Sequence, residues 1–505
     1  MNAEKERSRS LWMEHPMDQD GPQLVGDSAT EVLVIGSGIA GLSCAYELVC
    51  SGHQVAVVDR GRIGRGMTAR TSAHLAFELD DFFEELRSLR GEDVCRQYYE
   101  SQSAAVDRIE DICRQEAINC DFARVDGYFV PVEEKDIDYL RKELDAARAA
   151  GFTDAEWVEN GPGPWRSNPA VRFPRQGRFH PLKYLDALAE ALRRRGATLC
   201  AESPIVGLDE KDGQVRAKTG TGGIITAAHV VVATNSPFHL RIPIHTKQAP
   251  YRTYVIVGPI PKGAAPDALI WDTLEPSYHY VRIHPGRDED MLIVGGEDHK
   301  AGEADDMDER LYRLEVWARE RFPELGPISH KWSGQVFEPS DYVPFIGKSP
   351  GYERVYLVTG DSGEGLTAGV AGALLIRHLI DQGASPWSDV YDPDRLMMRG
   401  AIEFAKENLH AAKHWAAHLG GGEVRSVDDI PPGEGALVRI DGKMTAAFRT
   451  DEGDLKLCSA SCTHMGCVVR WNPFEQCWDC PCHGSHFSAD GEPLQGPAFE
   501  PLSKL

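Results

Sequence analysis

Residues 31–41 read Glu-Val-Leu-Val-Ile-Gly-Ser-Gly-Ile-Ala-Gly, and this stretch decides the fold of the first part of the chain. The short, mostly apolar run at 31–35 is typical of a buried parallel strand. A helical pattern follows the glycines and ends near Gly52, and a second short strand covers 54–58. Strand, helix and strand in this order predict a βαβ unit of a Rossmann-like α/β domain.

The turn inside this unit carries a glycine fingerprint for a dinucleotide. The first glycine permits the tight turn, the second lets the backbone approach a pyrophosphate, and the third lets helix and strand pack closely. Free N–H groups at the start of the helix would face the phosphates. Asp59 ends the second strand, where a carboxylate can accept ribose hydroxyl hydrogens. The other predicted contacts are Gly36, Gly38, Ile39, Ala40 and Gly41. The fingerprint does not distinguish FAD from NAD, and a glycine-rich turn without a ligand is the alternative.

Composition excludes some classes of function. The chain has 505 residues, with 54 Lys and Arg against 78 Asp and Glu, so its formal net charge is −24. Such a balance argues against a nucleic-acid binder and against docking on anionic lipid. Because no apolar run reaches the ~18 residues of a membrane span, we expect no membrane span. The polar N-terminus lacks an apolar signal segment, so we expect a cytoplasmic protein.

The composition and patterning of the sequence divide the chain into an N-terminal segment, a large middle part and a C-terminal part. Residues 1–29 are polar and are predicted to form an extended N-terminal arm. A long amphipathic helix is predicted over 394–419. The glycine triplet at 420–422 is a flexible break, and beyond it, over 423–505, the pattern changes to short strands, many turns and six of the 12 cysteines. We therefore expect a separate small all-β domain at the C-terminus.

The cysteine-rich part contains the most specific pattern in the sequence. One residue separates Cys462 from His464, and two separate Cys480 from His483. Each half offers one thiolate and one imidazole, which is the ligand set of a Rieske [2Fe–2S] centre, where two Cys hold one iron and two His hold the other. A zinc site is the alternative, although zinc sites more often use paired C-x2–4-C hooks. The sequence therefore predicts these four residues as iron ligands.

Further motifs identify the larger part of the chain as similar to the D-amino-acid-oxidase-like family of FAD-dependent oxidoreductases. They are Ser-Leu-Trp at 10–12, the fingerprint, and the segments 64–75, 178–181, 230–235, 341–347 and 359–367. The resemblance implies a discontinuous FAD-binding domain over about 30–75, 171–244 and 341–393. It also implies an inserted α+β substrate domain over about 76–170 and 245–340, all within 30–420. The further FAD contacts that it implies are Arg60, Thr68, Val206, Ala233, Thr234, Gly360, Asp361, Gly365, Leu366 and Thr367.

The C-terminal part resembles a Rieske domain throughout. In that family a disulfide ties the two cluster loops together, and the matching residues here are Cys467 and Cys482. Ser485 matches a serine that donates a hydrogen bond to a cluster sulfur. Cys458 and Cys477 have no place in the pattern and are predicted to be ordinary buried thiols.

A flavin and a one-electron cluster on one chain indicate electron transfer. The prediction is an FAD-dependent dehydrogenase that oxidises an amine or amino acid and sends electrons through the cluster to a one-electron acceptor protein or a quinone-like acceptor. A flavoprotein relay without a small-molecule substrate and an O2-using amine oxidase are the alternatives. A non-haem-iron oxygenase is disfavoured because no domain for its iron site is visible. An oligomer is possible.

No catalytic base can be named from sequence. Candidates are His74 and Arg70, in a segment that passes near the flavin ring in the family, although a structural role for His74 is as plausible. Arg252 and Tyr254, on a predicted strand of the substrate domain, could bind a substrate carboxylate; an exposed strand face is the alternative.

Overall fold

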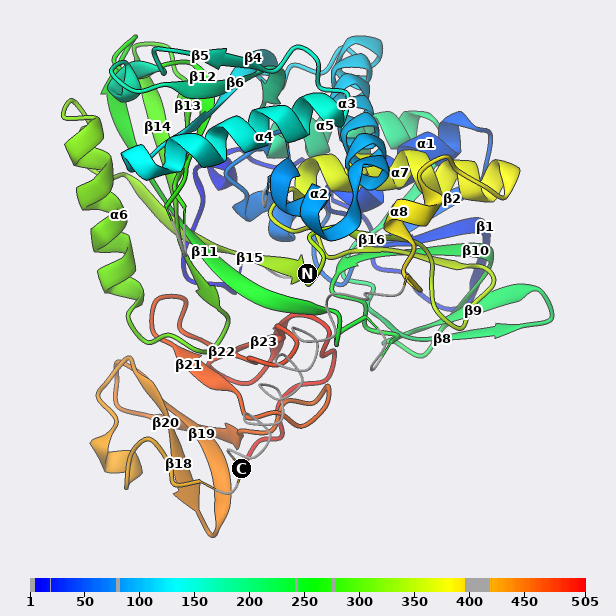
Figure 1. Ribbon diagram of the computed structural model, residues 1–505. Coiled ribbons are helices and arrows are strands. Elements are labelled where there is room, and N and C mark those ends of the chain that lie inside the picture. The colour runs from blue at the N-terminus through cyan, green and yellow to red at the C-terminus, as the bar shows by residue number, and fades with distance from the viewer. Residues whose placement is uncertain are drawn as a thin grey trace.

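The structure is a computed structural model that describes residues 5–18, 20–78, 82–240, 244–274, 278–395, 418 and 420–505. It contains two large sheets and a small C-terminal β domain (Figure 1). The helix predicted over 394–419 lies outside the described residues except at Asp394, Arg395 and His418. Among the described residues, no helix is long and apolar enough to span a membrane.

The first sheet is the predicted Rossmann-like layer. Its order is β16-β17-β10-β1-β2-β7, with β8 and β9 attached beside β10. The four strands β17, β10, β1 and β2 run parallel to one another, and β7 is parallel to β2. The bounds are β1 (Ser28–Ile35), β2 (Val55–Val58), β7 (Thr198–Cys200), β8 (Ile205–Lys211), β9 (Gln214–Thr219), β10 (Ile224–Asn235), β16 (Phe345–Lys348) and β17 (Val355–Thr359). These strands come from segments far apart in the chain, so the domain is discontinuous, as the family resemblance implies.

Helices cover both sheets. Helices α1 and α7 cross closely, because a side chain at Gly369 would press on Ala40. The helices are α1 (Ile39–Cys50), α2 (Phe83–Arg90), α3 (Glu92–Gln115), α4 (Ile137–Ala149), α5 (Pro181–Arg194), α6 (Met307–Arg321), α7 (Gly365–Gln382) and α8 (Ser388–Tyr391). Single 3-10 turns are η2 (Leu11–Glu14), η3 (Met67–Arg70), η4 (Glu134–Asp136), η5 (Gly163–Trp165) and η7 (Val427–Asp429).

The second sheet forms the inserted α+β domain. Its order is β15-β11-β14-β13-β12-β4-β6-β3, with β5 beside β6, and most neighbours are antiparallel. The bounds are β3 (His74–Leu75), β4 (Ala123–Val130), β5 (Glu156–Val158), β6 (Ala170–Arg178), β11 (Gln248–Pro261), β12 (Ala268–Asp272), β13 (Tyr280–Pro285), β14 (Glu289–Lys300) and β15 (His330–Pro339).

Two predicted boundaries move. The FAD-binding segment was expected to begin again at 171, but β6 pairs along its length with β4 and so belongs to the second sheet. The end of the preceding FAD-binding segment shifts as well, since β3, at His74–Leu75, pairs with the end of β6. The boundaries depend on strand pairing between distant segments, and this pairing cannot be predicted from the local sequence.

The C-terminal domain is all β, as predicted. One sheet has the order β18-β19-β20 and the other β21-β22-β23-β24. The bounds are β18 (Gly435–Ile440), β19 (Lys443–Arg449), β20 (Leu455–Ser459), β21 (Arg470–Asn472), β22 (Cys477–Asp479), β23 (His486–Ser488) and β24 (Pro493–Gln495). Its buried core includes Leu437, Trp478 and Phe487. In Figure 1 these orange and red strands lie below β11 and β15.

Part of the N-terminal segment, predicted as an extended arm, is buried, namely Glu6, Ser8 and residues 10–13. Trp12, in η2, is fully buried, and its indole N–H donates to the Thr71 carbonyl at 2.6 Å. Ser8 donates through its hydroxyl and its backbone N–H to the Glu475 carboxylate in the C-terminal domain. Residues 6–13 therefore pack between the large N-terminal part and the C-terminal domain, and Glu6, Ser8 and Ser10 find buried partners there.

Candidate functional site

A large cavity lies where the two sheets and the C-terminal domain meet. Most of the predicted dinucleotide-binding residues line it: Gly36, Gly38, Ile39, Ala40, Asp59, Arg60, Thr68, Ala233, Thr234, Asp361, Gly365 and Leu366. Four predicted FAD contacts are not among the described residues that line the cavity: Gly41, Val206, Gly360 and Thr367. Ile205 lines the cavity instead of its neighbour Val206.

The turn between β1 and α1 is built as the fingerprint predicts. Gly36 has a φ of +106°, and a side chain there would collide with the Ala233 carbonyl of β10. A side chain at Gly41 would collide with the Gly36 carbonyl, so the third glycine shapes the turn without lining the cavity. The Thr68 hydroxyl accepts the Ile39 N–H at 3.1 Å at the start of α1. Bare backbone at a helix N-terminus fits a pyrophosphate.

Asp59 is held rigidly at the end of β2. Its Oδ2 accepts from the backbone N–H and the hydroxyl of Ser37, both at 2.7 Å, and its Oδ1 accepts from the Gly61 N–H at 2.8 Å. Asp59 lines the cavity at this point, where the fingerprint places the ribose. The geometry fits the predicted role.

The start of α7 forms another wall of the cavity. Asp361 accepts the Phe337 N–H at 2.9 Å, and its burial raises the pKa of the carboxyl to about 6. A side chain at Gly365 would collide with this carboxyl group, so only glycine fits there. The N-terminal end of α7 thereby comes close to the cavity, where its dipole favours negative charge on a bound group.

The candidate catalytic residues fall into two pairs. His74 lines the cavity between Trp271 and Tyr280, with ring centroids 5.8 and 5.6 Å away. Burial, and secondarily the charge of Arg282, lower the pKa of His74 to about 3, so its imidazole is neutral. Arg70 also lines the cavity, but its guanidinium bonds Ser8 and Glu475.

The other pair faces away from the cavity. Arg252 is fully buried and donates to both carboxylate oxygens of Asp479 in the C-terminal domain, each at 2.7 Å. Tyr254 bonds His299 at 3.0 Å, and its ring packs on Phe474 of the same domain. The expectation that Arg252 and Tyr254 bind a substrate carboxylate is therefore corrected, since their face of β11 is covered by the C-terminal domain.

A buried charged network joins the domains. It contains Glu6, Arg70, Glu475, Arg252, Asp479 and His486. The Glu6 carboxylate lies 3.3 Å from Arg70 and 2.9 Å from His486, and both side chains of the Glu6–Arg70 pair are fully buried. Burial alone would raise the pKa of Glu6, but Arg70 and His486 hold it well below its usual range. Sequence reasoning missed Glu6 because its partners lie hundreds of residues away.

The predicted iron ligands gather on two loops of the C-terminal domain. One loop joins β20 to β21 and the other joins β22 to β23. The rings of His464 and His483 lie 5.0 Å apart, and the thiols of Cys462 and Cys480 interact directly. Backbone N–H groups of each loop point at its own sulfur, which suits an anionic thiolate. Two sulfurs and two imidazoles at one place fit a Rieske cluster.

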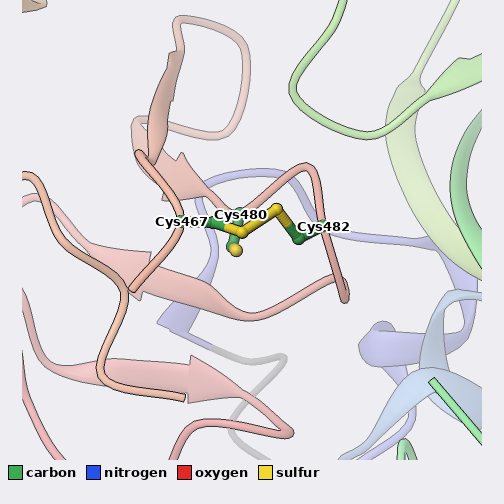
Figure 2. Close-up of side chains that lie close together, drawn as sticks. All are labelled: Cys467, Cys480 and Cys482. Atoms are coloured by element: carbon green, nitrogen blue, oxygen red, sulfur yellow. A yellow bond between two sulfur atoms is a disulfide. The ribbon is translucent and has the colours of Figure 1, made fainter. Parts of the chain in front are cut away.

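A disulfide lies beside the ligands. Cys467 and Cys482 are joined across the two loops, and Figure 2 shows Cys480 next to their bond. Ser485 interacts with the Cys462 sulfur, and its Oγ accepts the Ala498 N–H at 3.0 Å. Cys458 and Cys477 are buried in other surroundings, beside Asp490 and Asp479.

The C-terminal domain also reaches the cavity itself. Gly496, Pro497, Ala498 and Phe499 line it. Arg60, predicted as a cofactor contact, donates to the carbonyls of Leu494 and Ala498 at 2.9 and 3.1 Å. The cluster loops and the dinucleotide cavity are therefore connected through Ala498, which bonds Ser485 on one side and Arg60 on the other.

Comparison with known proteins settles the family. The model for FAD-dependent oxidoreductases (DAO) matches residues 31–379. The chain belongs to this FAD-dependent oxidoreductase family. The model for the Rieske [2Fe-2S] domain matches residues 422–505. FAD and a Rieske [2Fe–2S] cluster are thus the two cofactors of this oxidoreductase.

Some similar proteins match the whole chain, and others match only its larger part. The Rieske 2Fe-2S iron-sulfur protein YhfW of Bacillus subtilis (strain 168) is 30% identical over 99% of this chain and 98% of its own. Gamma-glutamylputrescine oxidoreductase of Escherichia coli (strain K12) is 24% identical over 69% of this chain and 83% of its own. L-proline dehydrogenase of P. horikoshii has the same fold, with a TM-score of 0.61 and 20% identity over 74% of this chain and 99% of its own.

The cluster can be tested directly on the purified oxidoreductase. We expect about two irons and about two acid-labile sulfides per chain, because two Cys and two His complete one [2Fe–2S] centre. Electron paramagnetic resonance of the reduced protein should show an average g value below that of all-cysteine clusters. Stoichiometric zinc without iron would contradict the assignment.

The disulfide should stabilise the cluster loops. Cys467 and Cys482 are 15 residues apart, and closing a loop of that size is worth about 3 kcal/mol in the unfolded chain. The double variant Cys467→Ser/Cys482→Ser should therefore lose its cluster absorbance at clearly lower urea concentrations. Cys458→Ala, a change at a buried thiol outside both loops, is the control. Equal urea midpoints for wild type and the double variant would refute the prediction.

Proposed function

We propose that this oxidoreductase oxidises an amine or amino acid at FAD and passes the electrons through its own Rieske cluster to an external acceptor. One observation carries the proposal: the C-terminal domain lines the FAD cavity with residues 496–499, and Ala498 of that segment bonds Ser485 beside the cluster ligands. Two redox sites built into one continuous set of contacts are suited to electron transfer between them.

Different residues of the cavity would bind the cofactor and contact the substrate. When bound, FAD supplies hydride acceptance and the cluster supplies one-electron transfer. Asp59 and the start of α1 hold the nucleotide end. The second sheet contributes Thr253, Trp271 and Tyr280 to the cavity lining, and the two aromatic rings would contact a substrate. His74 lines the same cavity, and because its pKa is lowered to about 3, its neutral imidazole would form a hydrogen bond with a substrate rather than take its proton.

The substrate class is supported by the names of relatives. Gamma-glutamylputrescine oxidoreductase and L-proline dehydrogenase act on an amine and an amino acid by name. A single dinucleotide fingerprint is visible in the sequence and FAD needs it, so we infer that electrons enter from an organic substrate rather than from a nicotinamide nucleotide. The acceptor would be a one-electron carrier protein or a quinone-like molecule.

The compartment follows from cysteine chemistry. Two cysteines form the disulfide, and of the other ten, two are the predicted cluster ligands Cys462 and Cys480 and eight are unpaired thiols. Predominantly reduced thiols are typical of the cytoplasm, where we place the protein. The single disulfide is buried beside the cluster, which would shield it from the thiol pool.

The test is an anaerobic screen. Amines and amino acids are added to the holoenzyme while flavin absorbance and the cluster signal are followed. A substrate should bleach the flavin and then reduce the cluster. Bleaching without cluster reduction, with hydrogen peroxide formed in air, would instead indicate an oxidase. Failure of every amine and amino acid, with reduction by a protein donor, would indicate a relay.

A further inference from the structure

Gln335 connects the FAD cavity to the cluster loop. It lies on β15, is 3% exposed, and is one of the residues that line the cavity. Its Nε2 lies 2.9 Å from the Gly484 carbonyl oxygen and 2.9 Å from His486 Nε2. Gly484 directly follows the cluster ligand His483, so one side chain touches both redox sites.

The orientation of this amide is determined by its partners. A backbone carbonyl only accepts, so the NH2 group of Gln335 must face Gly484. His486 Nδ1 lies 2.9 Å from Glu6, whose carboxylate also only accepts, so Nδ1 carries the ring hydrogen. His486 Nε2 is then left to accept the second amide hydrogen. Both hydrogens of Gln335 are thus used on the C-terminal domain.

The remaining polar atom of the Gln335 side chain is its amide oxygen. Gln335 Oε1 is buried and has no hydrogen-bond partner among the described residues. An unsatisfied buried acceptor is destabilising, and native proteins satisfy nearly all of them. Because the side chain lines the cavity and its nitrogen faces the other way, the missing donor is expected from the molecule that fills the cavity.

We propose that Gln335 Oε1 accepts a hydrogen bond from bound FAD, from an N–H of the flavin ring or an O–H of its ribityl chain. Gln335 then is a positioning residue shared by both cofactors. It provides a bonded path from the flavin through Gly484 to the cluster loop. As a route for electrons this rests on the proposed function; as a contact with FAD it does not.

Two variants of the holoenzyme distinguish the role of the Gln335 amide oxygen from that of its amide nitrogen. Gln335→Leu removes both, and losing the bond to FAD should raise the FAD dissociation constant about fivefold. After photoreduction of the flavin, the rate of cluster reduction should fall about tenfold. Gln335→Glu keeps an acceptor but removes the donors to Gly484, so FAD affinity should be retained while cluster reduction slows.

Ser333→Ala is the matched control. Ser333 lies two residues earlier on β15 and bonds Glu475 and Arg252 in the same interface, but it is not among the residues that line the cavity. It should leave both quantities within about twofold of wild type. Unchanged FAD affinity in Gln335→Leu, or equal losses in Ser333→Ala, would overturn the proposal. If the wild-type cluster is never reduced by its flavin, the proposed function fails, while the FAD affinities still test the contact.

Discussion

Cys480→Ser should give a protein whose flavin is still bleached by substrate but whose electrons no longer reach a one-electron acceptor protein. Cys480 is one of two thiolates in the predicted ligand set, and serine cannot replace a thiolate on iron. The flavin cavity is lined by other residues and should remain intact. Reoxidation of the flavin by the acceptor should slow about a hundredfold or more, since even partners behind the metal ligands are worth 10–100-fold.

The measurement combines iron content, paramagnetic resonance and anaerobic stopped-flow absorbance. Cys458→Ser is the control, because this buried cysteine lies on β20, outside the ligand loops. Acceptor turnover at the wild-type rate in the cluster-free variant would show that electrons bypass the cluster. Efficient flavin reduction by NADH or NADPH would contradict the proposed direction of electron entry.

Asp479→Ala should loosen the whole junction between the domains. Arg252 on β11 would then remain fully buried under the C-terminal domain without its bidentate partner. Breaking a buried ion pair from one side costs about 3–5 kcal/mol, because the remaining charge is uncompensated. We expect the C-terminal domain to become sensitive to proteolysis at protease concentrations that leave the wild type intact, and its amides to exchange faster.

A double variant distinguishes a charge effect from a packing effect. Arg252→Met/Asp479→Leu replaces the pair by apolar groups, and such replacements are often neutral or stabilising. It should regain most of the protection lost in Asp479→Ala. Asp490→Ala, which removes an exposed partner of Lys456, should cost less than about 1 kcal/mol. A double variant no better protected than the single one would refute the argument from buried charge.

Local patterns were enough to predict the parts of the site that local chemistry defines. The glycine positions of the β1–α1 turn and the Cys/His spacing follow from what a pyrophosphate and a two-iron cluster require at short range. The structure brings Cys462, His464, Cys480 and His483 together on two neighbouring loops. The same motifs also indicate the family and both cofactors.

Contacts between residues far apart in the sequence could not be predicted from local patterns. Alternation along β11 correctly suggests that Arg252 and Tyr254 share a face, but nothing near them in sequence shows that Asp479 and Phe474 cover it. Glu6 meets His486 across 480 residues, and nothing near either residue in the sequence indicates this contact. Val206 was misplaced by a single residue, since Ile205 lines the cavity. In a strand, one residue is the difference between its two faces.

The packing of the N-terminal segment bears on how the protein is made. Ser8 and Glu475 are separated by 467 residues. At about 5–20 residues per second, a ribosome needs roughly 20 to 90 s to pass from one to the other. The strands of both sheets and α7 are complete only once Gln382 has been made, so in the last part of that interval the cavity has its own walls but no C-terminal cover. FAD has a time window in which to enter from a side that is later closed, so the order of synthesis favours loading the flavin before the iron–sulfur domain docks.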